Sequence, residues 1–348
     1  MNAVSVRSYN ERLVLSLLLQ SKGLSRMEIG KRTGLSAQTI SVIVRSLEQE
    51  GLVAKGEAQK GRMGPPTIPL SLNPDGAYAV GVSLGHRHID VALLDFVGDV
   101  KFFATLDIPP QKPGQNESDL IDAVRAAIGA LPSNASTRLA GVGLAIPEDR
   151  EELALVPEGL TERFESIGKE IETALGVEVY VQNDITAAAA GESMFGAAKS
   201  LDDYLFFYLG ARLHHRLILN HQIFQSPSQT SSQIGLLDLE ARLRNDGRHP
   251  LDALWARQAE WPDFGEVAES WVDDCIGELS RSISSASQFL PVNTVIVSSY
   301  APGEICEKIA SELGMKHSGI DARAGALRAS PKAMGAACLP FSSKFTVS

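Results

Sequence analysis

Two short helical segments joined by a glycine constrain the start of the chain more tightly than any other feature. Ser25 can cap a helix over "SRMEIGKRTG", and Glu28, three residues on, completes a capping box. Gly34 ends this helix, and Ser36 caps the next one, "SAQTISVIVRSLEQEG". The apolar side chains of that second helix share one face: Ile40, Ile43, Val44 and Leu47. A third helical pattern covers residues 7 to 20, so the first fifty residues predict a helix-turn-helix.

In a helix-turn-helix protein the second helix enters the major groove of DNA. The positions expected to meet DNA are Ser36, Ala37, Gln38, Thr39, Ser41 and Arg45. Gln38 can bond bidentately to adenine, whereas Arg45 is better placed to meet phosphate. The alternative for this segment is a small helical bundle that binds no ligand.

The segment "GLVAKGEAQKGRMGPPTIPLSLN" follows and resembles a two-stranded wing. It alternates weakly between apolar and polar residues and breaks into a turn rich in Gly, Arg and Pro. Lys60 and Arg62 at the tip are predicted to reach phosphates or an A/T-rich minor groove. The alternative is a basic linker that is only solvated. Because one such head has little affinity for DNA, we expect a homodimer, or a dimer of dimers, on two half-sites.

Charge separates this head from the rest of the chain. Residues 1 to 72 carry ten Lys and Arg against five Asp and Glu, whereas the remainder carries 22 against 37. A basic head on an acidic body predicts that only the head meets a polyanion such as double-stranded operator DNA.

Length and cysteine usage limit the remaining possibilities. A chain of 348 residues is too long for one ordinary core. No signal peptide opens it, and no run approaches the roughly 18 apolar residues of a membrane helix. The three cysteines, Cys275, Cys306 and Cys338, are scattered and form no C-x-x-C pair. These features predict a cytoplasmic protein with no membrane association.

From residue 77 the pattern changes to strands that alternate with helices. "AYAVGVSLG", "HIDVALLDF" and "DVKFFATLDI" read as strands, and "ESDLIDAVRAAIGAL" as an amphipathic helix. Further strand patterns occur in "LAGVGLAIP", "VEVYVQND", "DYLFFYLG" and "NTVIVSS". This alternation predicts an α/β architecture.

Several segments, in order along nearly the whole chain, resemble the ROK family of repressors and sugar kinases, in its DNA-binding branch. They are the helix-turn-helix, "GRMGPP", "GVSLG", "GVGLAIP", "VQNDITAAAAGE" and "PKAMGAACL". The resemblance implies a winged helix-turn-helix over 1–72 and an effector and dimerisation domain over 73–348. It implies for this domain a two-lobed actin-like or hexokinase-like (ribonuclease H-like) fold. One lobe would cover about 73–182 with the C-terminal helix returning to it, and the other about 183–320.

The resemblance also shows where this chain departs from the family's kinases. Their first phosphate loop begins with an acid, and here Ser83 stands in its place, followed by His86 and Arg87. Their second loop is rich in glycine, whereas "LGARLHHRLILNH" keeps only Gly210. A third glycine-rich turn for adenosine is replaced by "VSSYAPGE". These changes predict a protein that is not an enzyme and has no catalytic residues and no nucleotide cofactor.

The family's zinc site is also altered. Gln233 stands for its glutamate and Leu236 for its histidine, and the cysteine loop that follows is deleted. No cysteine occurs before residue 275, which excludes a thiolate zinc site in that region. We therefore expect no metal and no other cofactor.

The resemblance implies sugar-binding roles for four residues. Asn183 and Asp184 match sugar-contacting positions, and Asp184 also matches the kinase base. Glu240 matches a third acid if the loop deletion is placed before it, and Gln233 can still bond hydroxyls. The alternative is that Asn183 and Asp184 only cap a helix.

Together these observations predict a sugar-responsive transcriptional regulator, a repressor, whose sugar would close two lobes and move the winged heads. One alternative is an ATP-dependent sugar kinase that carries a DNA-binding head. Another is a regulator controlled by a protein partner in place of a sugar.

Overall fold

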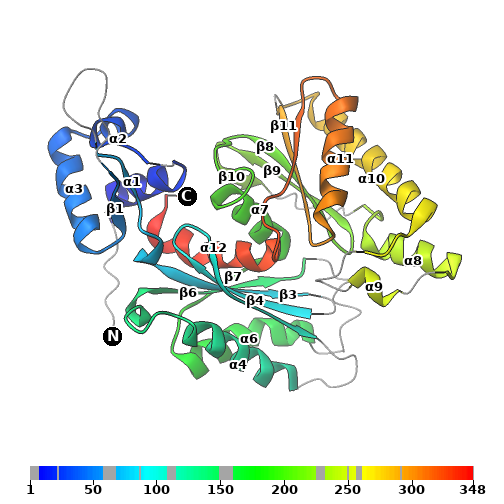
Figure 1. Cartoon of the computed structure of the whole chain (residues 1–348), viewed down its shortest axis with the longest axis horizontal. Coiled ribbons are helices and arrows are strands. Elements are labelled where there is room, and N and C mark those ends of the chain that lie inside the picture. The colour runs from blue at the N-terminus through cyan, green and yellow to red at the C-terminus, as the bar shows by residue number, and fades with distance from the viewer. Residues whose placement is uncertain are drawn as a thin grey trace.

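The structure, a computed structural model, describes most of the chain in ten stretches. They are residues 8–21, 23–57, 68–85, 88–107, 115–148, 160–224, 232–248, 251–255, 261–290 and 292–347. Figure 1 shows a small helical head beside a larger body that contains two β-sheets.

The head is a winged helix-turn-helix, as predicted. Its elements are α1 (Tyr9–Leu19), α2 (Arg26–Thr33), α3 (Ala37–Gln49), β1 (Val53–Lys55) and β2 (Leu70–Leu72). The side chains of Ser25 and Glu28 form the predicted capping box, and their hydrogen bonds lower the pKa of Glu28. Gly34 adopts a left-handed conformation (φ 72°), which permits the tight turn into α3. β1 and β2 pair antiparallel at the base of the wing.

The first sheet of the body has the strand order β5-β4-β3-β6-β7. Its strands are β3 (Tyr78–Leu84), β4 (His88–Asp95), β5 (Val100–Asp107), β6 (Leu139–Ile146) and β7 (Val179–Asn183). α4 (Gln115–Gly129) and α6 (Leu160–Leu175) cover one face, while α12 (Pro331–Phe345) covers the other (Figure 1). Two short 3-10 helices, η1 (Pro74–Gly76) and η2 (Ser136–Arg138), precede β3 and β6.

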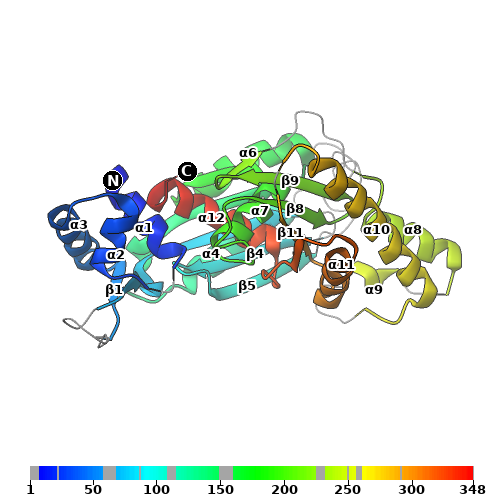
Figure 2. The ribbon, with the colours of Figure 1, turned by 90° about the horizontal axis from the view of Figure 1, so that it is seen from above.

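The second sheet has the order β10-β9-β8-β11-β12. Its strands are β8 (Tyr204–Leu209), β9 (Leu213–Leu219), β10 (Gln222–Phe224), β11 (Thr294–Ser299) and β12 (Asp321–Ala324). The helices packed on one face are α8 (Leu236–Asp246), α9 (Asp252–Trp255), α10 (Gly265–Ala286) and α11 (Gly303–Lys316). α7 (Asp184–Met194) packs on the opposite face and lies between the two sheets (Figures 1 and 2). The predicted α/β class is confirmed.

α12 lies closer to its neighbours than ordinary side chains allow. A side-chain carbon at Gly81 of β3 would collide with the backbone of Ala333, and one at Gly143 of β6 with Ala336. A side-chain carbon at Gly335 would likewise collide with the carbonyl group of Ala187 in α7. α12 is therefore packed backbone against backbone on both the first sheet and α7.

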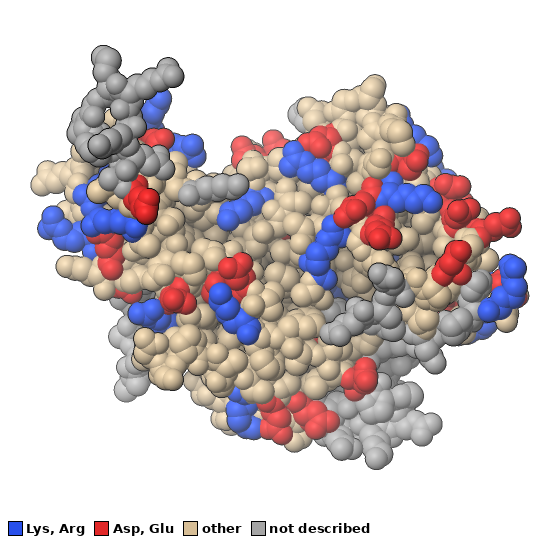
Figure 3. All heavy atoms as spheres, viewed as in Figure 1, with Lys and Arg blue, Asp and Glu red and all other residues tan. Residues whose placement is uncertain are grey.

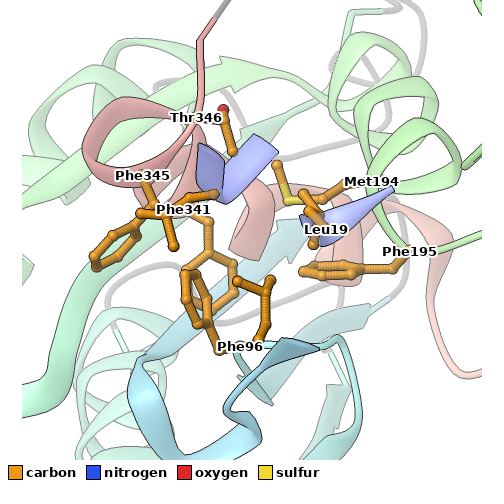
Figure 4. Close-up of a pocket in the computed structure, with 9 residues that line it drawn as sticks. Leu19, Phe96, Met194, Phe195, Phe341, Phe345 and Thr346 are labelled. Atoms are coloured by element: carbon orange, nitrogen blue, oxygen red, sulfur yellow. The ribbon is translucent and has the colours of Figure 1, made fainter. Parts of the chain in front are cut away.

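The head is docked on the C-terminal end of α12 through an apolar seam. Figure 4 shows the side chains that line it: Leu15, Leu19, Leu72, Phe96, Met194, Phe195, Phe341, Phe345 and Thr346. The ring centroids of Phe96 and Phe345 lie 4.9 Å apart, and those of Phe96 and Phe341 lie 5.6 Å apart. These contacts join α1, the first sheet and α12 in one core.

Among the residues that the structure describes, no helix is both long and apolar enough to cross a membrane.

The packing of α12 predicts opposite effects for two glycine-to-alanine changes. Gly335→Ala should lower the free energy of unfolding by about 1–3 kcal/mol or more, because the added methyl group meets the backbone of α7. Gly277→Ala is the matched control, since Gly277 lies inside α10 with open space around it. It should raise stability by about 0.5–1 kcal/mol. Denaturant unfolding measures both, and equal effects would contradict the close packing.

Candidate functional site

One face of α3, the helix predicted to enter the major groove, presents a stripe of exposed side chains. Gln38, Val42 and Arg45 are exposed and follow one another at intervals of four and three residues, so they share a helix face. Val42 is 63% exposed, and an apolar group at this place can contact the methyl group of thymine. Val42 was not among the predicted DNA contacts, although its spacing of four residues from Gln38 places both on one helix face.

The hydroxyl groups predicted for this face are committed to the helix itself. Ser36 Oγ accepts a hydrogen bond from the Thr39 N–H (3.1 Å) and lies 2.8 Å from Thr39 Oγ1. Ser41 Oγ donates to the Ala37 carbonyl (2.8 Å). Ala37 itself is exposed at the start of the helix. Gln38 and Val42 are therefore the larger exposed side chains near the start of α3 for which no such internal hydrogen bond is described.

The helix before α3 carries exposed basic side chains, Lys31 and Arg32 of α2. Figure 3 shows Lys and Arg on the head together with Asp and Glu. Arg26 and Lys55 pair with Glu48, which fixes the end of α3 against α2 and β1. Lys60 and Arg62 lie outside the described residues, so their predicted contacts stay predictions.

A second candidate site lies where β7 ends and α7 begins. Asn183 is the N-cap of α7, and its side-chain oxygen accepts a hydrogen bond from the Thr186 N–H (2.7 Å). Asp184 follows as the first helical residue and is 1% exposed. The structure thus places both residues at the junction of the two sheets.

The carboxylate of Asp184 is engaged by two protein groups. One oxygen accepts a hydrogen bond from the backbone N–H of Glu148 (3.0 Å), and the other forms an ion pair with Lys332. Lys332 belongs to the first turn of α12 and is 8% exposed. Its ammonium also lies 4.9 Å from the ring centroid of Tyr208 in β8. The sequence analysis did not predict Lys332, although a lysine in the alanine-rich start of α12 was a visible anomaly.

Arg216 of β9 forms a second buried ion pair, with Glu148 from the loop after β6. Its guanidinium also donates to Thr186 Oγ1 (2.9 Å), Asn183 Oδ1 (3.1 Å) and the His215 carbonyl (2.8 Å). Arg216 and Glu148 come from different sheets, so their pairing joins the two lobes. These two residues, together with the four that surround them, form what we call the cleft cluster: Glu148, Asn183, Asp184, Tyr208, Arg216 and Lys332.

The other two predicted sugar contacts lie in the second lobe. Glu240 is 7% exposed on α8, and its carboxylate accepts hydrogen bonds from Trp255 Nε1 (2.9 Å) and Arg244 (2.8 Å). Gln233 is exposed in the segment before α8. Both views place α8 far from the head, whereas α7 lies centrally (Figures 1 and 2). These two hydrogen bonds tie Glu240 to α8 and α9.

The segments that match the family's phosphate and adenosine positions form hydrogen bonds with other groups of the protein. The Gly210 carbonyl accepts a hydrogen bond from the Leu236 N–H (2.8 Å), and Ser299 Oγ donates to the Leu209 carbonyl (2.5 Å). Ser83 is buried inside β3. His86 and Arg87 lie outside the described residues.

The cysteines are buried separately on α10, α11 and α12. Burial raises the pKa of Cys275 and Cys338, and raises that of Cys306 to about 12. They are therefore neutral thiols and poor metal ligands. Among the described residues, no three His, Cys, Asp or Glu side chains gather as a metal site would require.

The interlobe ion pair predicts a large and partly recoverable loss of stability. Arg216→Met should lower the free energy of unfolding by about 3–5 kcal/mol, because it leaves the Glu148 carboxylate buried without its cation. Adding Glu148→Gln should recover part of that loss. Denaturant unfolding of the parent and the two variants makes the measurement.

The matched control is Arg281→Met, which removes a largely exposed arginine from its pair with Glu278 on α10. It should cost at most about 1 kcal/mol. A loss for Arg216→Met no larger than this one would show that the interlobe pair is not buried as described.

Comparison with known proteins relates both parts of the chain to families. Residues 8–62 match the model of the MarR family, and residues 79–245 match that of the ROK family. The uncharacterized protein y4fQ of Sinorhizobium fredii is 24% identical over 96% of this chain and 91% of its own length. The xylose repressor of Bacillus subtilis is 25% identical over 68% of this chain. That alignment spans 62% of the repressor, less than two thirds of its length.

Two solved structures share the fold. A ROK family transcriptional regulator, described as a homolog of the Escherichia coli MLC protein, has a TM-score of 0.63 at 18% identity. It covers 97% of this chain, and this chain covers 96% of it. The ROK hexokinase of Thermus thermophilus has a TM-score of 0.53 at 17% identity, over 76% of this chain and 98% of its own. The chain therefore combines a MarR-like winged helix with a ROK family domain of hexokinase-like fold.

Proposed function

We propose that this protein is a transcriptional repressor that binds operator DNA as a homodimer and responds to a sugar or sugar derivative. The observation that carries the proposal is the exposed stripe of α3, presented by a head that is docked on a sugar-kinase-like body. As a DNA-binding regulator the protein would act in the cytoplasm.

The DNA-binding half of the proposal rests on the shape and charge of the head. Gln38 and Val42 face outward where a recognition helix meets base edges, and Arg45 continues the stripe toward phosphate. Lys60 and Arg62 at the wing would add phosphate or minor-groove contacts. Two heads are needed to read two half-sites, which is why we propose a homodimer or a dimer of dimers. The similarity to a xylose repressor agrees with this role.

The sugar-sensing half rests on the cleft cluster. Asn183, Asp184 and Arg216 offer the donors and acceptors that a polyol needs, and they lie at the junction of the lobes. Internal ion pairs already join the lobes there. A sugar would therefore act by replacing Arg216 or Lys332 as the partner of a carboxylate. This differs from the closure of an open cleft that the sequence suggested. Gln233 and Glu240 are proposed as second-lobe contacts only for a ligand long enough to reach α8.

A non-catalytic role for Asp184 is part of the proposal. A kinase base must direct one carboxylate oxygen at a substrate hydroxyl, and here Lys332 and the Glu148 N–H engage both oxygens. The loss of glycines at the phosphate positions also supports this role. The kinase alternative draws only on the fold shared with the hexokinase.

The first functional prediction concerns a sugar-dependent change in DNA binding. Fluorescence anisotropy is measured on a duplex that the parent chain selects from a random pool, with D-xylose, D-glucose and their phosphates added in turn. One of these sugars should shift the dissociation constant of the parent by about fivefold or more and leave Asp184→Ala unchanged. Tight DNA binding that no sugar changes would favour a protein partner as the effector.

The same preparations test the kinase alternative. Incubation with ATP, Mg²⁺ and each sugar should yield no sugar phosphate. A turnover that Asp184→Asn abolishes would revive the enzyme and remove the non-catalytic role of Asp184.

The second functional prediction separates base reading from phosphate binding. Gln38→Ala should relax the preference at one base pair by about 1–3 kcal/mol. Arg45→Ala should weaken all duplexes alike and reduce the slope of log K against log salt by about 1. Arg281→Ala, on a distant surface of the body, is the control and should do neither. Parent-like binding by both head variants would show that the reading face is assigned wrongly.

A further inference from the structure

α12 contacts both the cleft cluster and the DNA-binding head. In its first turn, Lys332 forms the ion pair with Asp184 of the cleft cluster. Beyond its last turn, the carbonyl of Thr346 accepts a hydrogen bond from Arg12 Nε in α1 of the head (2.5 Å). Figures 1 and 2 both show the C-terminal end of α12 beside the head. One helix of 15 residues therefore spans the roughly 20 Å between cleft and head.

The contact with the head is built from several independent groups. Arg12 also donates to the Ser342 carbonyl (3.4 Å), and the N–H of Val347 donates to Ser16 Oγ (2.9 Å). A cation such as Arg12 is favourable at a helix C-terminus, where the macrodipole is negative. Phe341 and Phe345 pack against the side chains of α1 in the apolar seam (Figure 4). The head is thereby held in register with α12.

The opposite end of α12 depends on Asp184. Lys332 is a buried cation at a helix N-terminus, where the macrodipole is positive and disfavours it. The Asp184 carboxylate compensates this charge, and the ring of Tyr208 adds a weaker contact. A ligand that takes over Asp184 would remove this ion pair from the ammonium of Lys332 and so disfavour this position of the first turn.

The middle of α12 has little room to move independently of its neighbours. The backbone of Ala333 and Ala336 meets Gly81 and Gly143, and Gly335 meets α7, so this part of the helix cannot shift without them. Closely packed interfaces of this kind shift between discrete arrangements and do not deform smoothly.

We propose that Lys332 is a positioning residue that couples ligand binding at Asp184 to the position of the DNA-binding head. α12 connects the two places, and Arg12 is its contact in the head. This inference rests on the proposed function for its biological meaning. The physical coupling between the two ends of α12 can be tested without it.

The first test is a double-mutant cycle on DNA affinity that combines Lys332→Met with Arg12→Met. Dissociation constants are measured by fluorescence anisotropy on the duplex that the parent chain selects. If α12 couples its two ends, the effect of Arg12→Met changes by about fivefold or more in the Lys332→Met background. Unconnected sites this far apart give additive effects within about twofold, and additivity would overturn the inference.

Two further variants keep this cycle interpretable. Lys308→Met removes an exposed lysine from α11 and should be additive with Arg12→Met. The pair Lys332→Met/Asp184→Asn removes both buried charges, and it replaces Lys332→Met in the cycle if the single variant does not fold.

The second test is hydrogen exchange of the backbone amides of α1 (Tyr9–Leu19), measured without DNA. The pair Lys332→Met/Asp184→Asn should speed this exchange by about fivefold or more, although the substitutions lie roughly 20 Å away, whereas Lys308→Met should not change it. Unchanged exchange in α1 would overturn the coupling. If the exchange responds but the parent selects no duplex, the coupling holds and the proposed function fails. If the parent binds DNA and both tests show no coupling, only the inference fails.

Discussion

The close approach of α12 to the first sheet and to α7 is the constraint on which the rest of the structure depends. Gly81, Gly143 and Gly335 allow backbone to meet backbone, which brings the start of α12 to the Asp184 junction and its end to the head. A bulkier contact at any of these points would separate the helix from the sheet. The position of Lys332, the seam of aromatic rings and the docking of α1 all follow from that spacing.

The cleft cluster shows how charged side chains are accommodated where the two sheets of a hexokinase-like fold meet. Two ion pairs fill the junction of the lobes, Lys332 with Asp184 and Arg216 with Glu148. Buried pairs add little net stability compared with apolar packing, but each partner becomes costly to remove. Such a junction suits a switch, because a ligand that competes for one partner changes the balance of the whole cluster.

Local sequence signals predicted the head well and the cleft only in part. Ser25, Glu28 and Gly34 define their helix ends by short-range hydrogen bonds and backbone conformation, which a reader of the sequence can recognise. The start of α7 at its N-cap, Asn183, was predictable for the same reason. Arg216 and Lys332 meet residues 68 and 148 positions away in the chain, and no local pattern encodes such pairings. Val42 was missed because exposure is a tertiary property, although helix periodicity would have placed it beside Gln38.

The docking of the head has a consequence for the order of folding. Arg12 and Thr346 are 334 residues apart in sequence, so the contact that orients the head forms between segments that are synthesised at widely separated times. The winged helix has its own apolar core and can assemble from local contacts early. Until α12 reaches the first sheet, a nascent chain would carry a folded head whose direction is not yet set. The orientation of the head is thus acquired last, as a property of the finished domain.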